Sequence, residues 1–415
     1  MKTFGLLGEK LGHSFSPLIH SYLGEYAYPL YEVAPDDLDA FMKAGCFDGL
    51  NVTIPYKQTV VPYCATLSEE AQRIGSVNTI VKGPDGALHG YNTDYHGFGE
   101  LLISGGIDPA GKKALVLGDG GSARTVRLVL RDLAAGEIVT ISRRGENHYG
   151  NIGLHHDAEI IVNTTPVGMY PDNGARLLKL VDFRRLSGVA DLIYNPLRTG
   201  LLLDAMDLGL PNANGLYMLA AQAEMASRLF LGGPARPELA REIYRAVLQK
   251  TQNIALIGMP GSGKSTAGRA LAAMLGRPFV DVDARIEAEA GRSIPEIFAA
   301  DGEEVFRRLE THVLAEEAAG SGMVIATGGG VVTRPENYDL LRQNSFIVYM
   351  KRDLGELSTD GRPLSAGTGI QTLAIQRLPL YEAWSDCVIQ TEADPERTAT
   401  NIRERIAENM REVIG

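Results

Sequence analysis

The sequence predicts an α/β protein with two successive nucleotide-binding units. Apolar runs alternate with helical patterns along nearly the whole chain, and strands separated by helices are typical of parallel sheets covered on both faces. Two glycine-rich turns, at 118–121 and 258–263, each follow a predicted strand and open a predicted helix. Because these turns are of different types, and because 415 residues are enough for two or three domains, we expect two catalytic units.

The predicted strands are short apolar runs in both halves of the chain. They lie at Phe4–Leu7, Ala114–Leu117, Ile138–Ile141, Ile160–Val162, Val189–Ile193, Ile254–Ile257, Phe279–Val282, Val324–Ala326, Phe346–Met350 and Cys387–Gln390. Residues 237–249 have the pattern of an amphipathic helix. The boundary between the units is therefore placed near 250–252, with a linker of only a few residues, and a second boundary near 105–111 divides the first unit.

The composition narrows the range of partners. The formal net charge of −11, without a dense Lys/Arg run, disfavours nucleic acid and anionic membrane, but small anionic ligands are compatible with it. Three widely spaced cysteines, with no CxxC pair, favour reduced thiols over a zinc site or a disulfide framework. The N-terminal apolar run is too short for a signal peptide, and no stretch reaches the length of a membrane span. We expect a cytoplasmic protein that acts on small molecules, with monomer and homodimer both open.

The segment 258–265, Gly-Met-Pro-Gly-Ser-Gly-Lys-Ser, matches the phosphate-binding pattern G-x-x-x-x-G-K-[ST] at every fixed position. Glycines let successive backbone N–H groups face the phosphates, and the helix N-terminus adds its positive end. Lys264 is expected to neutralise the phosphates of ATP, and Ser265 to hold Mg²⁺. The predicted ATP-binding residues are Gly261, Ser262, Gly263, Lys264, Ser265 and Thr266. The C-terminal unit is therefore expected to be a small-molecule kinase.

Residues after this loop indicate what accepts the phosphate. Asp281 and Asp283 end the next strand, where strand ends line a ligand crevice, so they can orient a hydroxyl and help to place Mg²⁺. Arg307 is a candidate for binding an anion, but its helical spacing to two glutamates is also typical of a solvated salt-bridge surface. The glycines 328–330 follow a strand, and they either let the backbone approach a ligand or form a simple turn.

From about Asn253 to the C-terminus, the chain resembles shikimate kinase. The resemblance is carried by GMPGSGKST, DVD, FAADGEEVFRRLE, GGG, DGRPL and RLPLYEAWSD. It implies a P-loop, NMP-kinase-like parallel α/β domain in which Asp283 is catalytic and binds the hydroxyls of shikimate. Asp281 would help to hold Mg²⁺, largely through water, and the catalytic Arg362 would close over the ATP phosphates from a mobile lid. The shikimate carboxylate would be held by Arg307, Arg377, Gly329 and Gly330.

In the first unit, the turn at 118–121, Gly-Asp-Gly-Gly, lies between a strand and a helix. Such a turn alone is weak support for dinucleotide binding. Enzymes that use NAD place an Asp or Glu at the end of the next strand, where it binds the ribose 2′-hydroxyl. Here that strand is followed by Arg143 and Arg144. Two guanidinium groups suit a 2′-phosphate, so NADP is favoured over NAD; a solvated loop is the alternative.

The first hundred residues contain polar groups that suit a polyhydroxylated substrate. They are Ser14 and Ser16 in GHSFSP, Asn51, Thr53 and Lys57 in NVTIPYK, Asn78 in GSVNTI and Asp94 in GYNTDYHG. A Lys–Asp pair suits carbonyl reduction, because the ammonium can protonate the developing alkoxide while the carboxylate orients the ammonium. Taken singly, Lys57 is typical of a surface lysine, Asp94 of a helix N-cap and the serines of a turn.

Together these motifs resemble shikimate dehydrogenase over roughly residues 1–248. The resemblance is carried by SFSP, NVTIPYK, GSVNT, NTD, the glycine turn, NTTPVGM, DLIYNPLRT and GLYMLAAQA. It implies that Lys57 and Asp94 are the catalytic pair. The implied site for shikimate or 3-dehydroshikimate consists of Ser14, Ser16, Asn51, Thr53, Lys57, Asn78, Asp94 and Gln222, bordered by Tyr194. The implied NADP site consists of Gly118, Gly120, Gly121, Ser122, Arg143, Arg144, Thr164, Gly215 and Met218.

The resemblance also implies a domain plan: residues 1–104 and 215–250 form an α/β substrate domain, 105–214 a Rossmann NADP domain inserted into it, and 251–415 the kinase. Two departures stand out. Asp119 replaces the alanine that is usual in the turn, and a carboxylate close to a pyrophosphate is repulsive unless it points to solvent. Only 18 residues separate Arg144 from Asn163, so we expect the NADP domain to be trimmed by one element, with altered cofactor affinity.

The main prediction is a bifunctional enzyme. It would reduce 3-dehydroshikimate to shikimate with NADPH and then phosphorylate shikimate to shikimate 3-phosphate with Mg-ATP. Both reactions belong to the biosynthesis of chorismate and the aromatic amino acids. The two resemblances support each other, because the product of one reaction is the substrate of the other. In the alternatives, the kinase is fused to a quinate/shikimate dehydrogenase or to a degenerate module that only senses shikimate. A sensor would be free to lose Lys57 or Asp94, and both are present. Quinate shares the carboxylate and ring hydroxyls of shikimate, so the binding residues leave that choice open.

Overall fold

The computed structural model describes residues 2–12, 14–357 and 369–412. It consists of two compact units: the first extends to Val247, and the second begins at Leu248 and also includes the segment Asn195–Arg198. The predicted boundary at 250/251 lies beside this division, within helix α8 (Pro237–Thr251). Within the described residues, none of the helices combines the length and the apolar character needed to cross a bilayer.

The N-terminal part of the first unit is built on a mixed sheet with the strand order β2-β1-β3-β5-β6-β4. Its strands are β1 (Phe4–Gly8), β2 (Leu30–Glu32), β3 (Gly49–Val52), β4 (Thr66–Leu67), β5 (Thr79–Lys82) and β6 (Leu88–Tyr91). Its helices are α1 (Ser16–His20), α2 (Leu38–Ala44), α3 (Glu69–Ile74), α4 (Thr93–Ser104) and α7 (Gly215–Leu231), followed by α8.

The prediction of parallel sheets throughout is wrong for this part of the chain, because β5 runs antiparallel to both β3 and β6. A tight turn joins β5 to β6, closed by the Gly83 amide, which donates to the Ala87 carbonyl oxygen at 2.8 Å. A hairpin this short can only join antiparallel strands, since a parallel connection needs a crossover of a dozen or more residues.

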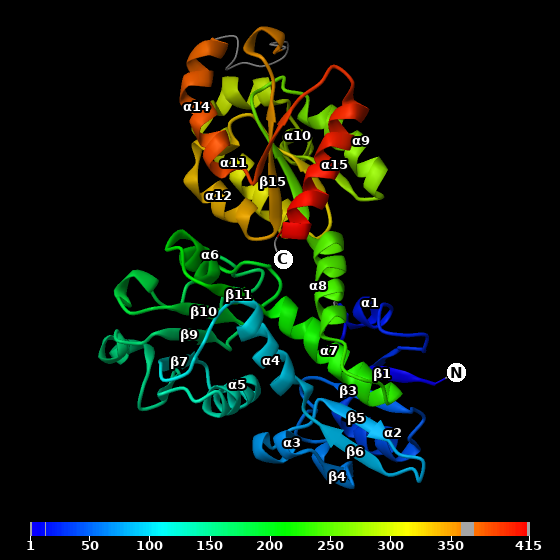
Figure 1. Cartoon of the computed structure of the whole chain (residues 1–415). Helices are drawn as coiled ribbons and strands as arrows, with labels where there is room; N and C mark the ends of the chain where they lie inside the picture. Colours follow the sequence, from blue (N-terminus) through cyan, green and yellow to red (C-terminus); the bar gives the residue numbers. More distant parts are fainter. Residues whose placement is uncertain (1, 13, 358–368, 413–415) are drawn as a thin grey trace. The chain divides into compact units, whose positions relative to one another are not determined.

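Helices α4 and α7 pack side by side, as Figure 1 shows. A Cβ atom added at Gly97 on α4 would lie 2.7 Å from the carbonyl oxygen of Met218 on α7, so glycine at this position allows the two backbones to approach closely. Between these helices in the sequence lies an inserted domain. The pair therefore forms the base on which the two domains of the first unit are joined.

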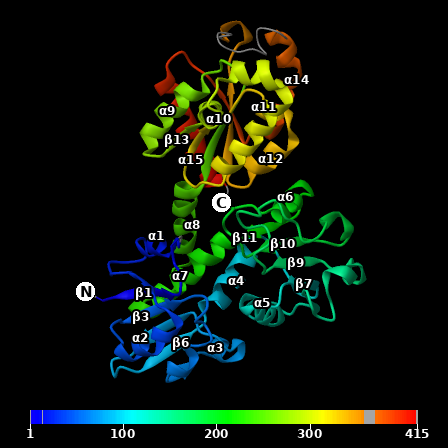
Figure 2. The same ribbon diagram turned by 180° about the vertical axis from the view of Figure 1, so that it is seen from behind.

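The inserted domain has a fully parallel sheet with the order β11-β10-β9-β7-β8, visible from behind in Figure 2. Its elements are β7 (Lys113–Leu117), α5 (Gly121–Asp132), β8 (Glu137–Ile141), β9 (Ile160–Asn163), β10 (Gly188–Asp191), α6 (Gly200–Asp207) and β11 (Asn212–Asn214). The chain leaves β7 towards β8 on one side and returns as β9 on the other. This reversal of strand order creates the crevice in which open α/β sheets bind ligands.

The connection from β8 to β9 is shorter than a usual crossover helix allows. A 3₁₀ helix, η3 (Tyr149–His155), stands where an α-helix normally covers the sheet. Its His148 N-cap accepts a hydrogen bond from the Gly150 amide at 3.1 Å, and Tyr149 and Ile152 pack onto the core beneath. The crossover is thus trimmed, yet β9 stays fully buried and β8 keeps Val139 and Ile141 buried.

The second unit has a parallel sheet with the order β13-β14-β12-β15-β16. Its strands are β12 (Asn253–Ile257), β13 (Phe279–Asp281), β14 (Val324–Ala326), β15 (Ser345–Lys351) and β16 (Cys387–Gln390). Its helices are α9 (Lys264–Leu275), α10 (Val282–Ala290), α11 (Ile294–Ala318), α12 (Pro335–Arg342), α14 (Ile370–Trp384) and α15 (Pro395–Glu412). Every strand predicted from the sequence is present, with ends that differ by at most two residues.

Alternation along the central strand β12 builds a core on each side of this sheet. Ala255 and Ile257 belong to the cluster that α10, α11, α12 and α14 cover, whereas Ile254 and Leu256 pack against α9 and α15. Because successive side chains in a strand point to opposite faces, a continuous apolar run is what a sheet covered on both sides requires.

Candidate active sites

The first unit contains a cavity of about 500 Å³ whose wall brings together all nine of its predicted substrate residues. These residues come from six separate stretches of the sequence, which the fold brings together. The cavity is lined by Ser14, Ser16, Asn51, Thr53, Lys57, Asn78, Asp94, Tyr194 and Gln222, together with Leu6, Lys10, Leu11, Gly12, Val52 and Leu219. Lys10 was not predicted, because an isolated lysine in a turn has no distinguishing pattern.

Lys57 and Asp94 form an ion pair in this cavity, with Nζ 2.6 Å from Oδ2. Lys57 lies in the turn after β3, and Asp94 lies in the first turn of α4, whose N-cap is Asn92. The Lys57 side chain is 30% exposed and that of Asp94 is 18% exposed. Lys57 is therefore not an ordinary surface lysine, and Asp94 does more than begin a helix. A partly desolvated ammonium held by a carboxylate is suited to donating a proton to a developing alkoxide.

Amides and hydroxyls form a connected network behind this pair. Asn51 Nδ2 donates to Thr79 Oγ1 at 3.1 Å, and Asn78 Oδ1 accepts from the Thr93 amide at 2.6 Å. Thr93 Oγ1 in turn donates to Gln222 Oε1 on α7 at 3.2 Å. Because each amide is fixed by its neighbours, the polar atoms that face the cavity are held in place before a ligand arrives.

An uncharged aromatic stack supports Asn51 from the other side. Tyr28 donates its hydroxyl proton to Asn51 Oδ1 at 2.7 Å, and the His20 ring stacks on Tyr28 with centroids 3.7 Å apart. Burial lowers the pKa of His20 to about 3, so the imidazole is neutral at physiological pH. The charge of the cavity therefore comes from its lysines and from Asp94.

The cofactor crevice lies where β7 and β9 end. Gly118 has a φ of 103°, and a Cβ atom there would lie 2.8 Å from Thr164 Oγ1. Thr164 donates to the Leu117 carbonyl oxygen at 2.7 Å, so the glycine turn and the NTTPVGM motif pack together. A Cβ at Gly120 or Gly121 would meet nothing within 4 Å, so the backbone faces open space at the start of α5.

The other predicted cofactor residues lie around this crevice. Arg143 and Arg144 are exposed in the loop after β8, and Ser122 is exposed in the first turn of α5. Gly215 opens α7 so close to Leu192 that any Cβ would strike the Leu192 carbonyl. Met218, one turn further, packs against the core below the crevice.

A buried carboxylate that the sequence analysis missed ties these motifs together. Asp191, fully buried at the end of β10, accepts from Asn163 Nδ2 at 3.1 Å and from Thr199 Oγ1 at 2.7 Å. It also accepts from the Ile193 amide at 3.0 Å, and burial raises its pKa to about 6. Asp191 thereby links the cofactor motif at Asn163 to the loop that carries Tyr194.

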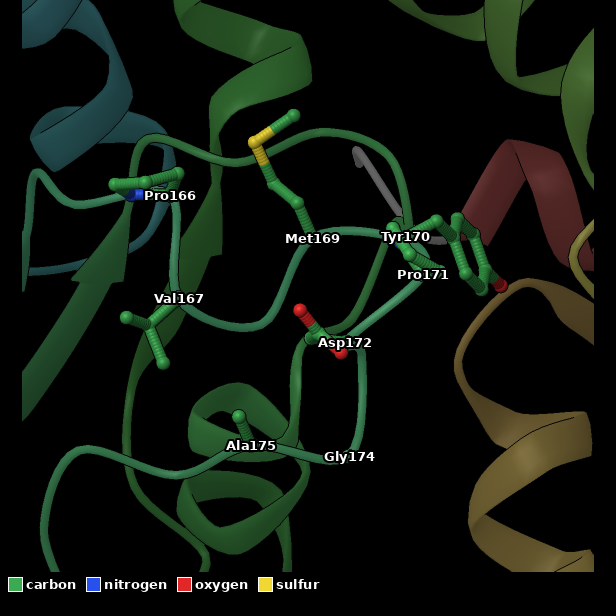
Figure 3. Close-up of a pocket in the computed structure, with 8 residues that line it drawn as sticks. All are labelled: Pro166, Val167, Met169, Tyr170, Pro171, Asp172, Gly174 and Ala175. Carbon is green, nitrogen blue, oxygen red and sulfur yellow. The ribbon is translucent and has the colours of Figure 1, made fainter.

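A second hollow, of about 780 Å³, lies along the loop that follows β9. Figure 3 shows its lining side chains on one looped segment: Pro166, Val167, Met169, Tyr170, Pro171, Asp172, Gly174 and Ala175. It offers a single carboxylate and no cationic side chain. The cavity with Lys57 and Asp94 is therefore the better candidate for catalysis, and this loop contains the second half of the NTTPVGM motif.

In the second unit, the phosphate loop has the geometry that its sequence predicts. Gly263, at φ 91°, is the N-cap of α9, and Lys264 Nζ donates to the carbonyl oxygens of Gly258 and Met259 at 2.9 and 3.0 Å. Ser262 Oγ is buried without a hydrogen-bond partner among the described residues. A buried hydroxyl of this kind at a ring of backbone amides fits a phosphate oxygen.

Opposite this loop, Arg307 is buried rather than solvated. It is only 5% exposed, and its Nη1 donates to Glu310 Oε2 at 2.7 Å. The alternative of a solvated salt-bridge surface is therefore wrong for Arg307: its ion pair with Glu310 is buried, and only its second partner, Glu303, is exposed. Glu310, also fully buried, was missed because its spacing to Arg307 is the same as on a surface helix.

Asp283 faces Glu310 across Gly328, since a Cβ atom at this glycine would collide with an oxygen of each carboxylate. Burial, and then the neighbouring charge of Glu310, raises the pKa of Asp283 to about 6. Asp281 lies at the N-cap of α10 and accepts from the Ala284 amide at 3.4 Å. The DVD motif thus has one half-buried carboxylate in the crevice and one at a helix start.

The glycines after β14 are held against the arginines. Arg377 Nη1 donates to the Gly329 carbonyl oxygen at 2.9 Å, and the buried Tyr381 hydroxyl donates to the same oxygen. A Cβ at Gly330 would collide with the guanidinium of Arg307, so only glycine fits there. Arg377 Nε is buried without a partner among the described residues, and the predicted lid residue Arg362 lies outside those residues.

Two family models match the chain, one in each unit. Residues 6–80 match the shikimate dehydrogenase substrate-binding domain, and residues 260–407 match shikimate kinase. The first match covers the cavity residues from Leu6 to Asn78, and the second covers nearly all of the second unit from its phosphate loop onward.

Similar proteins agree with this division. The shikimate dehydrogenase (NADP(+)) of Clostridium perfringens is 37% identical over 265 residues, which are 59% of this chain and 97% of that protein. A chorismate mutase/shikimate 5-dehydrogenase fusion protein from Clostridium acetobutylicum matches with a TM-score of 0.57 and 34% identity, over 60% of this chain and 98% of its own. The shikimate 5-dehydrogenase from Thermus thermophilus, solved with NADP(H) and shikimate, matches with a TM-score of 0.54 and 34% identity, over 59% and 99%. The chain therefore belongs to the shikimate dehydrogenase family and carries a shikimate kinase domain in the same polypeptide.

Proposed function

We propose that this chain reduces 3-dehydroshikimate to shikimate with NADPH in its first unit and phosphorylates the shikimate 3-hydroxyl with Mg-ATP in its second. The observation that carries the proposal is the Lys57–Asp94 pair, at 2.6 Å, inside a cavity lined by hydroxyls and amides. The phosphate loop and the buried Arg307 supply the partner reaction. The product of the first step is the substrate of the second, which gives one chain a reason to carry both.

In the reduction, the Lys57 ammonium is the proton donor to the oxygen of the substrate's carbonyl. Asp94 holds the ammonium in position, and the network through Asn78 and Gln222 orients the polar groups that would bind the ring hydroxyls. Bound NADPH supplies the hydride. The open backbone at Gly120 and Gly121 and the exposed arginines after β8 fit a dinucleotide with a 2′-phosphate.

In the phosphorylation, Asp283 orients the attacking hydroxyl and accepts its proton, while Arg307 and Arg377 bind the carboxylate. The unpartnered Nε of Arg377 leaves a donor available to that carboxylate. Lys264 and Ser265 meet the phosphates and Mg²⁺ of the nucleotide. Phosphoryl transfer depends mainly on positioning and charge neutralisation, and these residues supply both.

The raised pKa of Asp283 predicts an acid limit for the kinase. Below pH about 6, Asp283 is protonated and cannot accept the hydroxyl proton, so kcat/KM for shikimate should fall as the pH drops through this value. The pH profile of kcat/KM measures this limb. Glu310→Gln removes the charge that contributes to the shift, and we expect the limb to move to lower pH.

The stability of the fold has the opposite dependence on this group. Because the pKa of Asp283 is raised from 3.8 to about 6 in the folded state, its contribution to stability is fully present below 3.8 and is lost as the pH rises through about 6. Protonation of Asp283 therefore does not unfold the protein. For the kinase, an acid limb of the kcat/KM profile that did not move in the Glu310→Gln variant would contradict the assignment of that limb to Asp283.

The proposal is tested by assaying purified protein for both reactions. We expect NADPH oxidation on addition of 3-dehydroshikimate, and formation of ADP on addition of shikimate. Protein that phosphorylates shikimate but oxidises no NADPH would contradict the bifunctional proposal and favour a sensing module. Running the reverse reaction with shikimate and with quinate gives the ratio of kcat/KM that separates a shikimate from a quinate/shikimate dehydrogenase.

A further inference from the structure

The glycine turn at the cofactor crevice carries an unusual acid, and the acid has a partner. Asp119, between Gly118 and Gly120, has a side chain that is 60% exposed, and its Oδ1 accepts from Arg127 Nη1 at 2.7 Å. Arg127 lies on α5, eight residues further along, and its side chain is 28% exposed. The carboxylate is therefore neither buried nor unpaired, but neutralised at the entrance to the crevice.

Arg127 also reaches the neighbouring strand. The same Nη1 donates to Thr140 Oγ1 on β8 at 3.1 Å, three residues before Arg143. One guanidinium thus spans the gap between the glycine turn and the end of the second strand. In a strand–turn–helix unit of this type, the adenosine ribose of a dinucleotide lies in that gap, with the pyrophosphate at the helix N-terminus. Among the described residues, both hydrogen bonds of the Arg127 guanidinium use Nη1, so Nε and Nη2 remain as donors for an anion.

The charges explain why the pair matters for a 2′-phosphate. A phosphate monoester carries roughly −1.5 to −2 charges near neutral pH, whereas the 2′-hydroxyl of NAD carries none. An unpaired carboxylate at position 119 would repel the phosphate and leave the hydroxyl unaffected. Paired with Arg127, the carboxylate opposes the phosphate much less than it would alone, while it also offsets part of the positive field that the guanidinium would add to that of Arg143 and Arg144.

We propose that Asp119 and Arg127 act together as a specificity-determining pair for the adenosine 2′-group, in which Arg127 favours the 2′-phosphate and Asp119 limits how tightly it is held. The proposal rests on the proposed dehydrogenase function and extends it to residues that the cofactor motifs do not include. It also accounts for the carboxylate in the turn, which by itself would oppose NADP binding.

The test measures Kd for NADPH and for NADH by nucleotide fluorescence in the full-length protein, without turnover. Arg127→Gln leaves Asp119 unpaired, so the ratio Kd(NADH)/Kd(NADPH) should fall by about tenfold. Asp119→Asn frees the guanidinium, so the ratio should rise by about threefold or more. The double variant should return to within about threefold of the wild type, and both shifts should shrink at high salt.

Controls separate this role from a structural one. Asp39→Asn breaks an exposed ion pair of the same 2.7 Å length on α2, and its ratio should be unchanged. Arg127→Lys keeps the charge and should stay near the wild-type ratio. If Arg127→Gln fails to fold, Asp119→Asn still decides, since it leaves the Thr140 hydrogen bond intact.

Equal changes in both Kd values, or no change in Asp119→Asn, would overturn the proposal. Wild-type protein that binds neither dinucleotide would instead overturn the dehydrogenase function, and the role of the pair with it. The two failures are therefore distinguishable from the wild-type titration alone.

Discussion

Replacing Lys57 with methionine should lower kcat for reduction of 3-dehydroshikimate by about 10²- to 10⁴-fold, the range typical of a lost general acid. Methionine keeps most of the volume of the side chain but removes the ammonium that lies 2.6 Å from Asp94. The substrate hydroxyls still meet Asn78 and Gln222, so KM should change much less than kcat. Phosphorylation of shikimate by the same protein should be unaffected, because the phosphate loop belongs to the second unit. NADPH oxidation and ADP formation, measured on one preparation, check both expectations.

Lys43→Met is the matched control for this variant. Lys43 pairs with Asp39 at 2.7 Å on α2, and its side chain is 72% exposed. The substitution therefore removes an equal charge and a similar ion pair outside the cavity. Its reduction rate should be that of the wild type. If Lys57→Met retained kcat within tenfold of the wild type, the proton donor would have to be another group, and Lys10, which also lines the cavity, would be the first to examine.

The strands and the phosphate loop were predictable because their signals are local. An apolar run such as NIALI, followed at once by a glycine loop and a helix, determines its own structure within about fifteen residues. The substrate cavity is different, because the strand order brings together Lys57, which follows β3, and Asp94, which begins α4 just after β6. Their spacing in the sequence predicts no contact. Their chemistry only suggested a pair, and the resemblance to a family assigned it.

Two of the residues that were missed, Glu310 and Asp191, share one physical cause, which is burial. The spacing of Glu310 to Arg307 is the same on a surface and in a core, and only the packing of α11 against the Gly328 turn places the glutamate inside. Asp191 stands at the end of a strand, where acidic residues are common, so its sequence position did not mark it. Its hydrogen-bond donors are Asn163 on β9, the Ile193 amide in the following loop and Thr199 at the start of α6. The mixed sheet was missed although the turn Pro84-Asp85-Gly86 is a hairpin signal.

Replacing Lys264 with methionine should stop phosphorylation and leave reduction intact. Lys264 is 8% exposed and donates to two carbonyl oxygens of its own loop, so the ammonium is held at the centre of the ring of amides. Without it, the charge that builds on the β- and γ-phosphates in the transition state is unopposed, and kcat/KM for ATP should fall by roughly 10²- to 10³-fold, as for other lost electrostatic groups. The coupled assay for ADP measures the loss, and NADPH oxidation in the same sample measures the retained activity.

The loss of two hydrogen bonds makes a check of folding necessary, and Lys351→Met is the matched variant. Lys351 lies at the end of the neighbouring strand β15 and pairs with Glu382 at 3.4 Å, with a side chain that is 50% exposed. Both variants should show the thermal transition of a folded protein, and only Lys264→Met should lose ADP formation. A folded Lys264→Met protein that lost reduction as well would contradict two independent sites, because nothing in the first cavity depends on this lysine. Together with Lys57→Met, which removes the other activity alone, the pair of variants separates the two reactions within one chain.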